Sequence, residues 1–145
     1  MKEIIKICLI FIIASCSVIT ERLAIKECKF SLLSVNPYDF TFSNLKLDFE
    51  LKVQNPNKID AVLDKLDYTF FVNKADVFTG TTGKGIKIPA GKSERFTTTI
   101  TLEYTKIGDA IVEALRLKKA EYKIKAKAYI NTKIGEISYP VEVSL

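Results

Sequence analysis

Cysteine is the residue type whose placement in this sequence most clearly indicates chemistry. The chain has 145 residues and three cysteines, and Cys16 follows two lysines, an apolar run over residues 7–13 and the small residues Ala14 and Ser15. A positive start, a short apolar run and small residues form the pattern of a secretory signal with its cleavage site. A spanning helix needs about 20 apolar residues, so this run is too short to cross a bilayer.

The segment Ile13-Ala14-Ser15-Cys16 resembles the lipobox of bacterial lipoprotein signal peptides. The resemblance implies cleavage before Cys16, diacylglycerol on its sulfur and acylation of the new amino terminus by a fatty acid such as palmitate. It predicts a lipoprotein signal peptide over residues 1–15 and a lipidated tether over residues 16–22. Two or more acyl chains anchor a protein stably, because each buried CH₂ contributes about 0.8 kcal/mol. An ordinary secretory signal and an uncleaved anchor are the alternatives.

A lipobox implies that the folded part lies in the cell envelope, outward of the inner membrane. Ser17 does not resemble a retention signal, which favours the outer membrane. Cys8 leaves with the signal and Cys16 is modified, so Cys28 has no partner for an intramolecular disulfide. We expect Cys28 to be a small buried side chain rather than a reactive thiol.

The groups needed for catalysis are missing from the sequence. It has no His, which removes the usual general base and the commonest metal ligand. The glycine-rich segment Gly80–Gly85 lacks the Lys-Ser/Thr pair of a phosphate loop, and it predicts a flexible hairpin. Asp60, Asp64 and Asp67 could supply oxygen ligands to calcium, but their spacing matches no known calcium loop, which favours a solvated turn. We therefore expect no catalytic residue, no metal site and no cofactor.

Lys123, Lys125 and Lys127 form the one coherent basic row in the sequence. They are candidates for contact with anionic lipid or lipopolysaccharide. The alternative is an exposed strand face that lysines protect against aggregation. The net charge of +5, from 22 basic and 17 acidic residues, is only mildly basic. Such a balance fits a lysine-covered surface, so no nucleic acid partner is expected.

Alternation of apolar and polar residues predicts the elements that must position these side chains. Residues 45–53 alternate without error, which places one row of side chains in a core and the other in water. A change of parity after Phe42 predicts a bulge or bend near Ser43-Asn44. Phe71 and Tyr129 fall out of phase, and they mark either a sticky edge or a second small core under a helix. The expected strands cover residues 23–35, 45–53, 66–72, 75–88, 96–104, 122–130 and 137–145.

One segment, residues 105–117, breaks the period of two. A helical stripe there consists of Ile107, Ile111 and Ala114/Leu115, with Thr105 as the expected cap and Asp109 in the first turns. The sequence therefore predicts a mainly β fold. It is an immunoglobulin-like antiparallel β-sandwich of about seven strands, with one α-helix before the last two strands that closes an edge or an end.

Three motifs, in order, resemble those of the late embryogenesis abundant type 2 family, also called the water stress and hypersensitive response domain. The cleanest strand ends in Asn55-Pro56-Asn57, Leu66-Asp67-Tyr68 leads to a turn at Asn73-Lys74 and then Gly80, and Ile88-Pro89-Ala90-Gly91 opens the next strand. The resemblance covers residues 23–145. Lys74 stands where the family turn often carries Gly, which leaves the turn type open.

The resemblance implies association with tolerance of drying, cold and other stress, without known catalysis. We expect a membrane-anchored, non-enzymatic lipoprotein that binds or stabilises client proteins, envelope proteins or the envelope surface. Two alternatives remain: a lipoprotein that holds a lipid or another apolar ligand between its sheets, and an accessory subunit of an envelope complex. The pattern predicts no oligomeric state.

Overall fold

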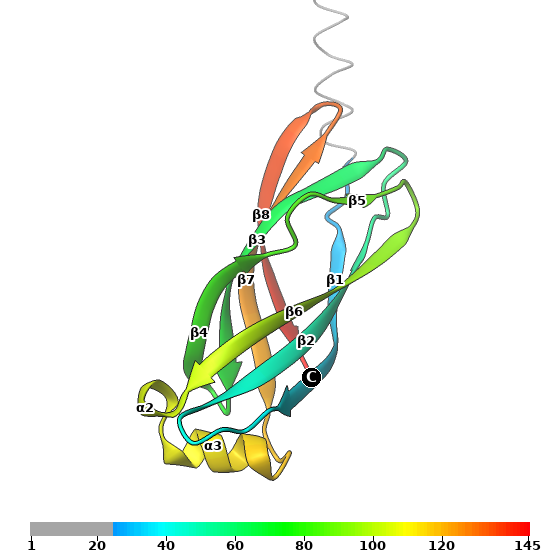
Figure 1. The fold of residues 1–145 in the computed structure, drawn as a ribbon. Helices are drawn as coiled ribbons and strands as arrows, with labels where there is room; N and C mark the ends of the chain where they lie inside the picture. The colour runs from blue at the N-terminus through cyan, green and yellow to red at the C-terminus, as the bar shows by residue number, and fades with distance from the viewer. Residues whose placement is uncertain (1–24) are drawn as a thin grey trace, which may run out of the picture.

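Two antiparallel sheets packed face to face make up the body of the protein, in a computed structural model that describes residues 25–145 (Figure 1). The expected signal peptide (residues 1–15), Cys16 and the expected tether (residues 16–22) lie outside the described residues. Within the described part, no helix is long and apolar enough to cross a bilayer. The predicted mainly β sandwich is confirmed.

The first sheet has the strand order β1-β2-β6, and the second has the order β4-β3-β7-β8, with β5 also paired to β3. The strands of the first sheet are β1 (Lys29–Tyr38), β2 (Asn44–Gln54) and β6 (Ser93–Glu103). Those of the second are β3 (Ala61–Val72), β4 (Ala75–Thr82), β5 (Ile86–Ile88), β7 (Tyr122–Thr132) and β8 (Gly135–Ser144). Two short helices, α2 (Tyr104–Ile107) and α3 (Asp109–Arg116), connect β6 to β7.

The core lies between the sheets and is built from the predicted alternating rows. On β2, the five apolar side chains of the row Leu45 to Val53 are each at most 1% exposed. Phe49 contacts the second sheet, with ring centroids 5.3 Å from Tyr68 and 5.4 Å from Phe70. Leu145 was expected in the last buried row, but it lies after the end of β8 and is exposed.

The helical segment closes one end of the sandwich, but it is two helices rather than the single one predicted (Figure 1). Gly108 separates them with φ 86° and ψ 156°, which lie outside the helical region. Thr105 lies inside α2 and does not cap it, whereas Asp109 is in the first turn of α3 as expected. Val112 and Leu115 are the buried side chains of α3, and Leu115 belongs to the core cluster, against which Ile107 and Ile111 of the predicted stripe also pack.

The first strand begins at Lys29, six residues later than predicted, and ends at Tyr38. Pro37 is accommodated because β1 is an edge strand, where a missing amide donor is tolerated. The change of parity after Phe42 is the bend in the β1–β2 connection, not a bulge within one strand.

The segment Gly80–Gly85 is not a hairpin, and that prediction was wrong. Both β4 and β5 run antiparallel to β3 along the same edge, so the chain continues in one direction through a bulge. Gly83 has φ +66°, and a Cβ atom there would lie 2.7 Å from Leu63 Cδ2. Glycine is therefore favoured at this position by its backbone conformation, and any larger residue would also have to displace the buried Leu63 side chain.

The turn at Asn73-Lys74 joins β3 to β4 with φ 48° and 70°. Positive φ at both central residues is the type I′ conformation of tight hairpins, so Lys74 adopts the backbone that glycine favours. The Asn73 side chain accepts a hydrogen bond from the Glu121 amide at 2.8 Å. This contact holds the turn against the segment that enters β7.

Candidate functional site

The Asn55-Pro56-Asn57 motif lies at the end of the sandwich opposite the helices, and Asn55 is fully buried. The Asn55 amide nitrogen donates to the carbonyl oxygens of Ile59, at 2.9 Å, and Ile88, at 3.0 Å. Its side-chain oxygen accepts from the backbone and side-chain nitrogens of Asn57, at 3.0 and 2.9 Å. All four hydrogen-bonding positions of this amide are therefore used.

Asn57 connects the motif to the first described residues of the chain. Its side-chain oxygen accepts from the Lys26 amide at 2.6 Å, and its nitrogen donates to the Lys26 carbonyl at 2.8 Å. The side chain thus pairs with the Lys26 backbone as a neighbouring strand would. Pro56 lacks an amide donor and holds Asn55 in an extended conformation. The motif therefore fixes the chain entry, the β2–β3 turn and the end of β5 together, which is a structural role.

A second contact to the entering chain comes from Tyr139 on β8. Its hydroxyl accepts from the Cys28 amide at 2.9 Å and lies 3.4 Å from the Cys28 carbonyl. The backbone groups of Lys26 and Cys28 are hydrogen-bonded to the side chains of Asn57 and Tyr139 instead of to a neighbouring strand. For this reason β1 begins only at Lys29. Cys28 is buried, as expected, and burial raises the pKa of its thiol despite the hydrogen bond with Tyr139. A thiol held protonated is a poor nucleophile.

Buried tyrosines make the stability of the domain sensitive to high pH. Burial raises the pKa of Tyr68 to about 12, and burial also raises the pKa of Tyr139. An unfolded tyrosine titrates near pH 10, so the stabilisation is complete below that pH and is lost as the pH rises through the folded pKa.

We expect the free energy of unfolding to fall by about 3 kcal/mol between pH 8 and pH 11, since each of two buried phenols contributes up to about 1.4 kcal/mol per pH unit above 10. Urea denaturation at both pH values measures this. Tyr139→Phe lowers stability at pH 8 but reduces the loss on going to pH 11 by about 1.4 kcal/mol. Equal losses in the two proteins would show that Tyr139 does not contribute.

The row Lys123, Lys125 and Lys127 lies on the outward face of β7, as the alternation predicted. Lys123 is half-buried and pairs with Glu142 of β8 at 3.3 Å. Lys125 and Lys127 are exposed, and their ammonium nitrogens lie 5.5 and 5.3 Å from the ring centroids of Phe71 and Tyr129. Contact of this row with an anionic surface stays a prediction.

Phe71 and Tyr129 do not form a second core under the helices. They lie on the outward face of β3 and β7, where Phe71 is paired with Lys123 and Tyr129 with Lys65. The Lys65 nitrogen lies 4.7 Å from the Tyr129 ring centroid. A lysine ammonium group is attracted to the face of an aromatic ring, so these rings and lysines form one amphipathic outward surface.

The three aspartates do not gather around a common point. Asp60 accepts from the Ala90 amide at 2.9 Å and lies 4.0 Å from Lys87. Asp67 accepts from the Thr81 hydroxyl at 2.7 Å and pairs with Lys65 at 3.1 Å, and these hydrogen bonds lower its pKa. Over residues 25–145, no three His, Cys, Asp or Glu side chains are placed to hold a metal ion.

One surface feature was missed by sequence reasoning. A groove of about 530 Å³ lies beside the Asn55-Pro56-Asn57 motif, at the end where the described chain begins. Three lysines from separate segments line it: Lys26, Lys58 and Lys133. They are too far apart in sequence to form a recognisable run, so no sequence signal could have grouped them.

Comparison with protein families identifies one match. The family model described as late embryogenesis abundant protein matches residues 50–145. The match begins within β2, at residue 50, whereas the expected resemblance begins at residue 23. Strand β1 and the start of β2 lie outside the match, although they belong to the same sandwich. Among curated proteins, none matches the sequence significantly.

Solved structures that resemble this chain have low sequence identity to it. A solution structure from Arabidopsis thaliana is 16% identical with a TM-score of 0.65, covering 84% of this chain and 82% of that one. A Bordetella pertussis crystal structure is 12% identical with a TM-score of 0.51, covering 83% and 95%. A solution structure described as a late embryogenesis abundant protein is 14% identical with a TM-score of 0.49, covering 99% and 84%. At these identities, the first two similarities show the fold alone.

Proposed function

The chain belongs to the late embryogenesis abundant family, a water-stress family, and from this membership we propose that it is a non-enzymatic protective protein held at a bacterial membrane. The observation that carries the proposal is the family match over most of the sandwich. In this proposal, the lipid on Cys16 attaches the chain to the outward side of the membrane, and the folded domain binds client proteins or the envelope surface as water is lost.

The lipobox-like segment that ends at Cys16 supports the membrane attachment. The outward face of β3 and β7 supports the contact role, because it presents lysines beside aromatic rings. Such a face offers both charge and apolar surface to a partly unfolded client.

The rows of Phe and Ile that suggested an apolar ligand now have another explanation. Phe49, Phe70 and Ile124 are each at most 1% exposed and belong to one packed cluster between the sheets. Their side chains fill the interior, as close-packed cores require. The protective role is therefore favoured over that of a lipid carrier.

The test is a drying assay with the chain purified without residues 1–15. We expect a drying-sensitive enzyme to retain more activity with this protein than with an equal mass of serum albumin. The triple variant Lys123→Gln, Lys125→Gln, Lys127→Gln should protect less. A matched variant with Lys106→Gln, Lys118→Gln and Lys119→Gln, which removes the same charge at the helical end, should protect as the wild type does. Protection no better than that of albumin would contradict the proposal.

A further inference from the structure

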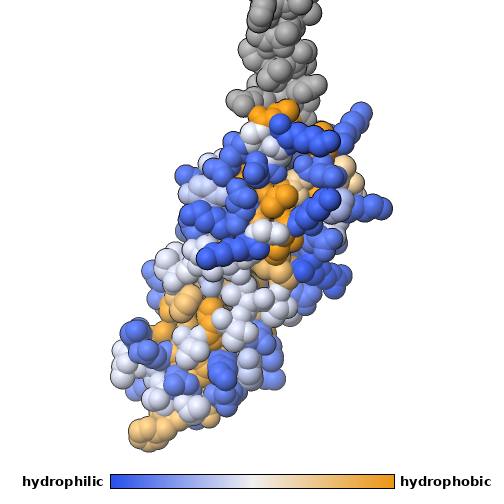
Figure 2. Space-filling view, turned by 45° about the horizontal axis from the view of Figure 1, so that its top comes forward, coloured by the Kyte–Doolittle hydropathy of each residue, from blue (hydrophilic) through white to orange (hydrophobic). Residues whose placement is uncertain are grey.

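The end of the sandwich where the described chain begins combines positive charge with apolar surface. Its groove of about 530 Å³ is lined by three lysines, by Asn57 and by apolar side chains. All three lysines are exposed. The apolar members are Ile25, Pro56, Ile59 and Ile134. Figure 2 shows apolar surface at this end with hydrophilic side chains around it.

The fold holds the three lysines in place through different contacts. The two hydrogen bonds with Asn57 fix the Lys26 backbone. Lys58 follows Asn57 in the same turn. Lys133 lies in the β7–β8 turn, which the pairing of Ala61 with Thr132 brings beside the start of β3. The arrangement is therefore built into the hydrogen bonding and the strand register.

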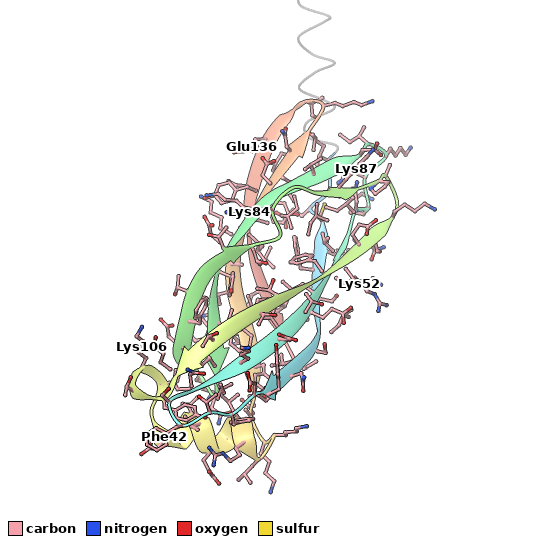
Figure 3. The ribbon with its side chains drawn as sticks, in the orientation of Figure 1. Phe42, Lys52, Lys84, Lys87, Lys106 and Glu136 are labelled. Carbon is pink, nitrogen blue, oxygen red and sulfur yellow. The ribbon has the colours of Figure 1, made fainter. Side chains whose placement is uncertain are left out.

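The charge at this end is directional. Among residues 25–145, no acidic side chain lines the groove, whereas Glu27 and Glu136 line the adjoining cavity of about 270 Å³. The basic groove and the acidic cavity therefore lie on different sides of this end. A flat, negatively charged surface would contact all three lysines in only one orientation of the domain. Lys106 and Phe42 lie at the opposite, helical end, far from Lys87 and Glu136 (Figure 3).

The reach of the tether restricts which end can meet a membrane. Ile25 lies nine positions after Cys16 in the sequence, and a fully extended chain of that length spans about 30 Å. Attraction to a charged bilayer is screened within about 8 Å at physiological salt. The groove at the chain entry therefore has the closest access to lipid headgroups if Cys16 carries the anchor.

We propose that this groove seats the domain on an anionic phospholipid bilayer, with Lys26, Lys58 and Lys133 on the headgroup phosphates and the apolar floor at headgroup level. The inference rests on the membrane attachment of the proposed function and adds an orientation and a lipid class. A lysine near an anionic leaflet favours the bound state by about fivefold, so three together favour the seated orientation by about a hundredfold.

The chain has no Trp, so Ile134→Trp introduces a single fluorescent reporter into the groove. The full-length protein, purified from its membrane, is reconstituted in vesicles of phosphatidylcholine alone or with phosphatidylglycerol. We expect a blue-shifted Trp emission only on the phosphatidylglycerol vesicles, and its reversal at high salt. Adding Lys26→Gln, Lys58→Gln and Lys133→Gln should abolish the shift. Adding Lys106→Gln, Lys118→Gln and Lys119→Gln should preserve it.

The outcomes separate this inference from the anchoring proposal. The mass of the amino-terminal peptide from the same sample reports whether Cys16 carries lipid, and flotation reports whether the chain is on the vesicles. A chain that floats with both lipids but shows no shift specific to phosphatidylglycerol overturns the seating and leaves the anchor intact. An equal loss of the shift in both triple variants, or a chain that does not float, also overturns the seating. Circular dichroism of each variant checks that the fold is retained.

Discussion

Replacing Asn55 by Ala is expected to lower the free energy of unfolding by about 3 kcal/mol. The substitution leaves three backbone groups without their partner: the buried Ile88 carbonyl, the part-buried Ile59 carbonyl and the buried Asn57 N–H. Each unsatisfied buried group costs about 1–3 kcal/mol, and a water molecule entering the vacated space recovers part of that cost. Since small domains are stable by only about 5–15 kcal/mol, the loss is a large fraction of the total.

Urea denaturation followed by circular dichroism measures this change. Gln54→Ala is the matched control, because the neighbouring side chain is exposed and surface substitutions change stability by less than about 0.5 kcal/mol. We also expect the Asn55→Ala protein to release the entering chain, seen as faster amide hydrogen exchange at Lys26. A loss of less than about 1 kcal/mol would show that the hydrogen bonds drawn together by Asn55 are replaceable.

Replacing Cys16 by Ala is expected to abolish lipid attachment completely. Cys16 is the cysteine that ends the lipobox-like segment. The resemblance implies that its sulfur carries the diacylglycerol and that its amino group, freed by cleavage, carries the second acyl group. An acyl chain of about 16 carbons contributes about 0.8 kcal/mol per buried CH₂, so its loss changes membrane partition by many orders of magnitude.

Cells labelled with a palmitate analogue provide the measurement. The wild type should be labelled and Cys16→Ala should not. Cys8→Ala and Cys28→Ala are the controls, since Cys8 lies in the expected signal and the Cys28 thiol is buried. Both should be labelled as strongly as the wild type. An unlabelled wild type would remove the anchoring proposal, and labelling lost with Cys8→Ala would place the lipid on the wrong cysteine.

Asn55 and Cys16 are expected to affect different properties of the protein. Asn55 acts through the fold, because every polar atom of its side chain is bonded within the protein. Cys16, in the anchoring proposal, acts through a lipid modification outside the folded domain. A variant at Asn55 should therefore remain lipidated, and a variant at Cys16 should remain folded. Measuring both properties on both variants tests this separation.

Local pattern was sufficient to predict the sandwich, because alternation along a strand reports which face is buried without reference to any distant residue. The row from Leu45 to Val53 and the outward row from Lys123 to Lys127 were both predicted in this way. The pattern failed where tertiary contacts replaced local ones. Gly83 reads as a hairpin turn locally, but β3 continues beside it and the chain keeps its direction.

The roles of the polar residues depended on contacts between distant parts of the chain. Asn57 meets Lys26 across 31 residues, and Tyr139 meets Cys28 across 111 residues. No short window of sequence contains both partners of such a bond, so the motif reads only as a turn until the strands are paired. The groove lysines follow the same rule: the residue types are visible in the chain, but their grouping depends on tertiary contacts. Strand register brings Lys133 beside Lys58, and the hydrogen bonds with Asn57 bring Lys26 to them.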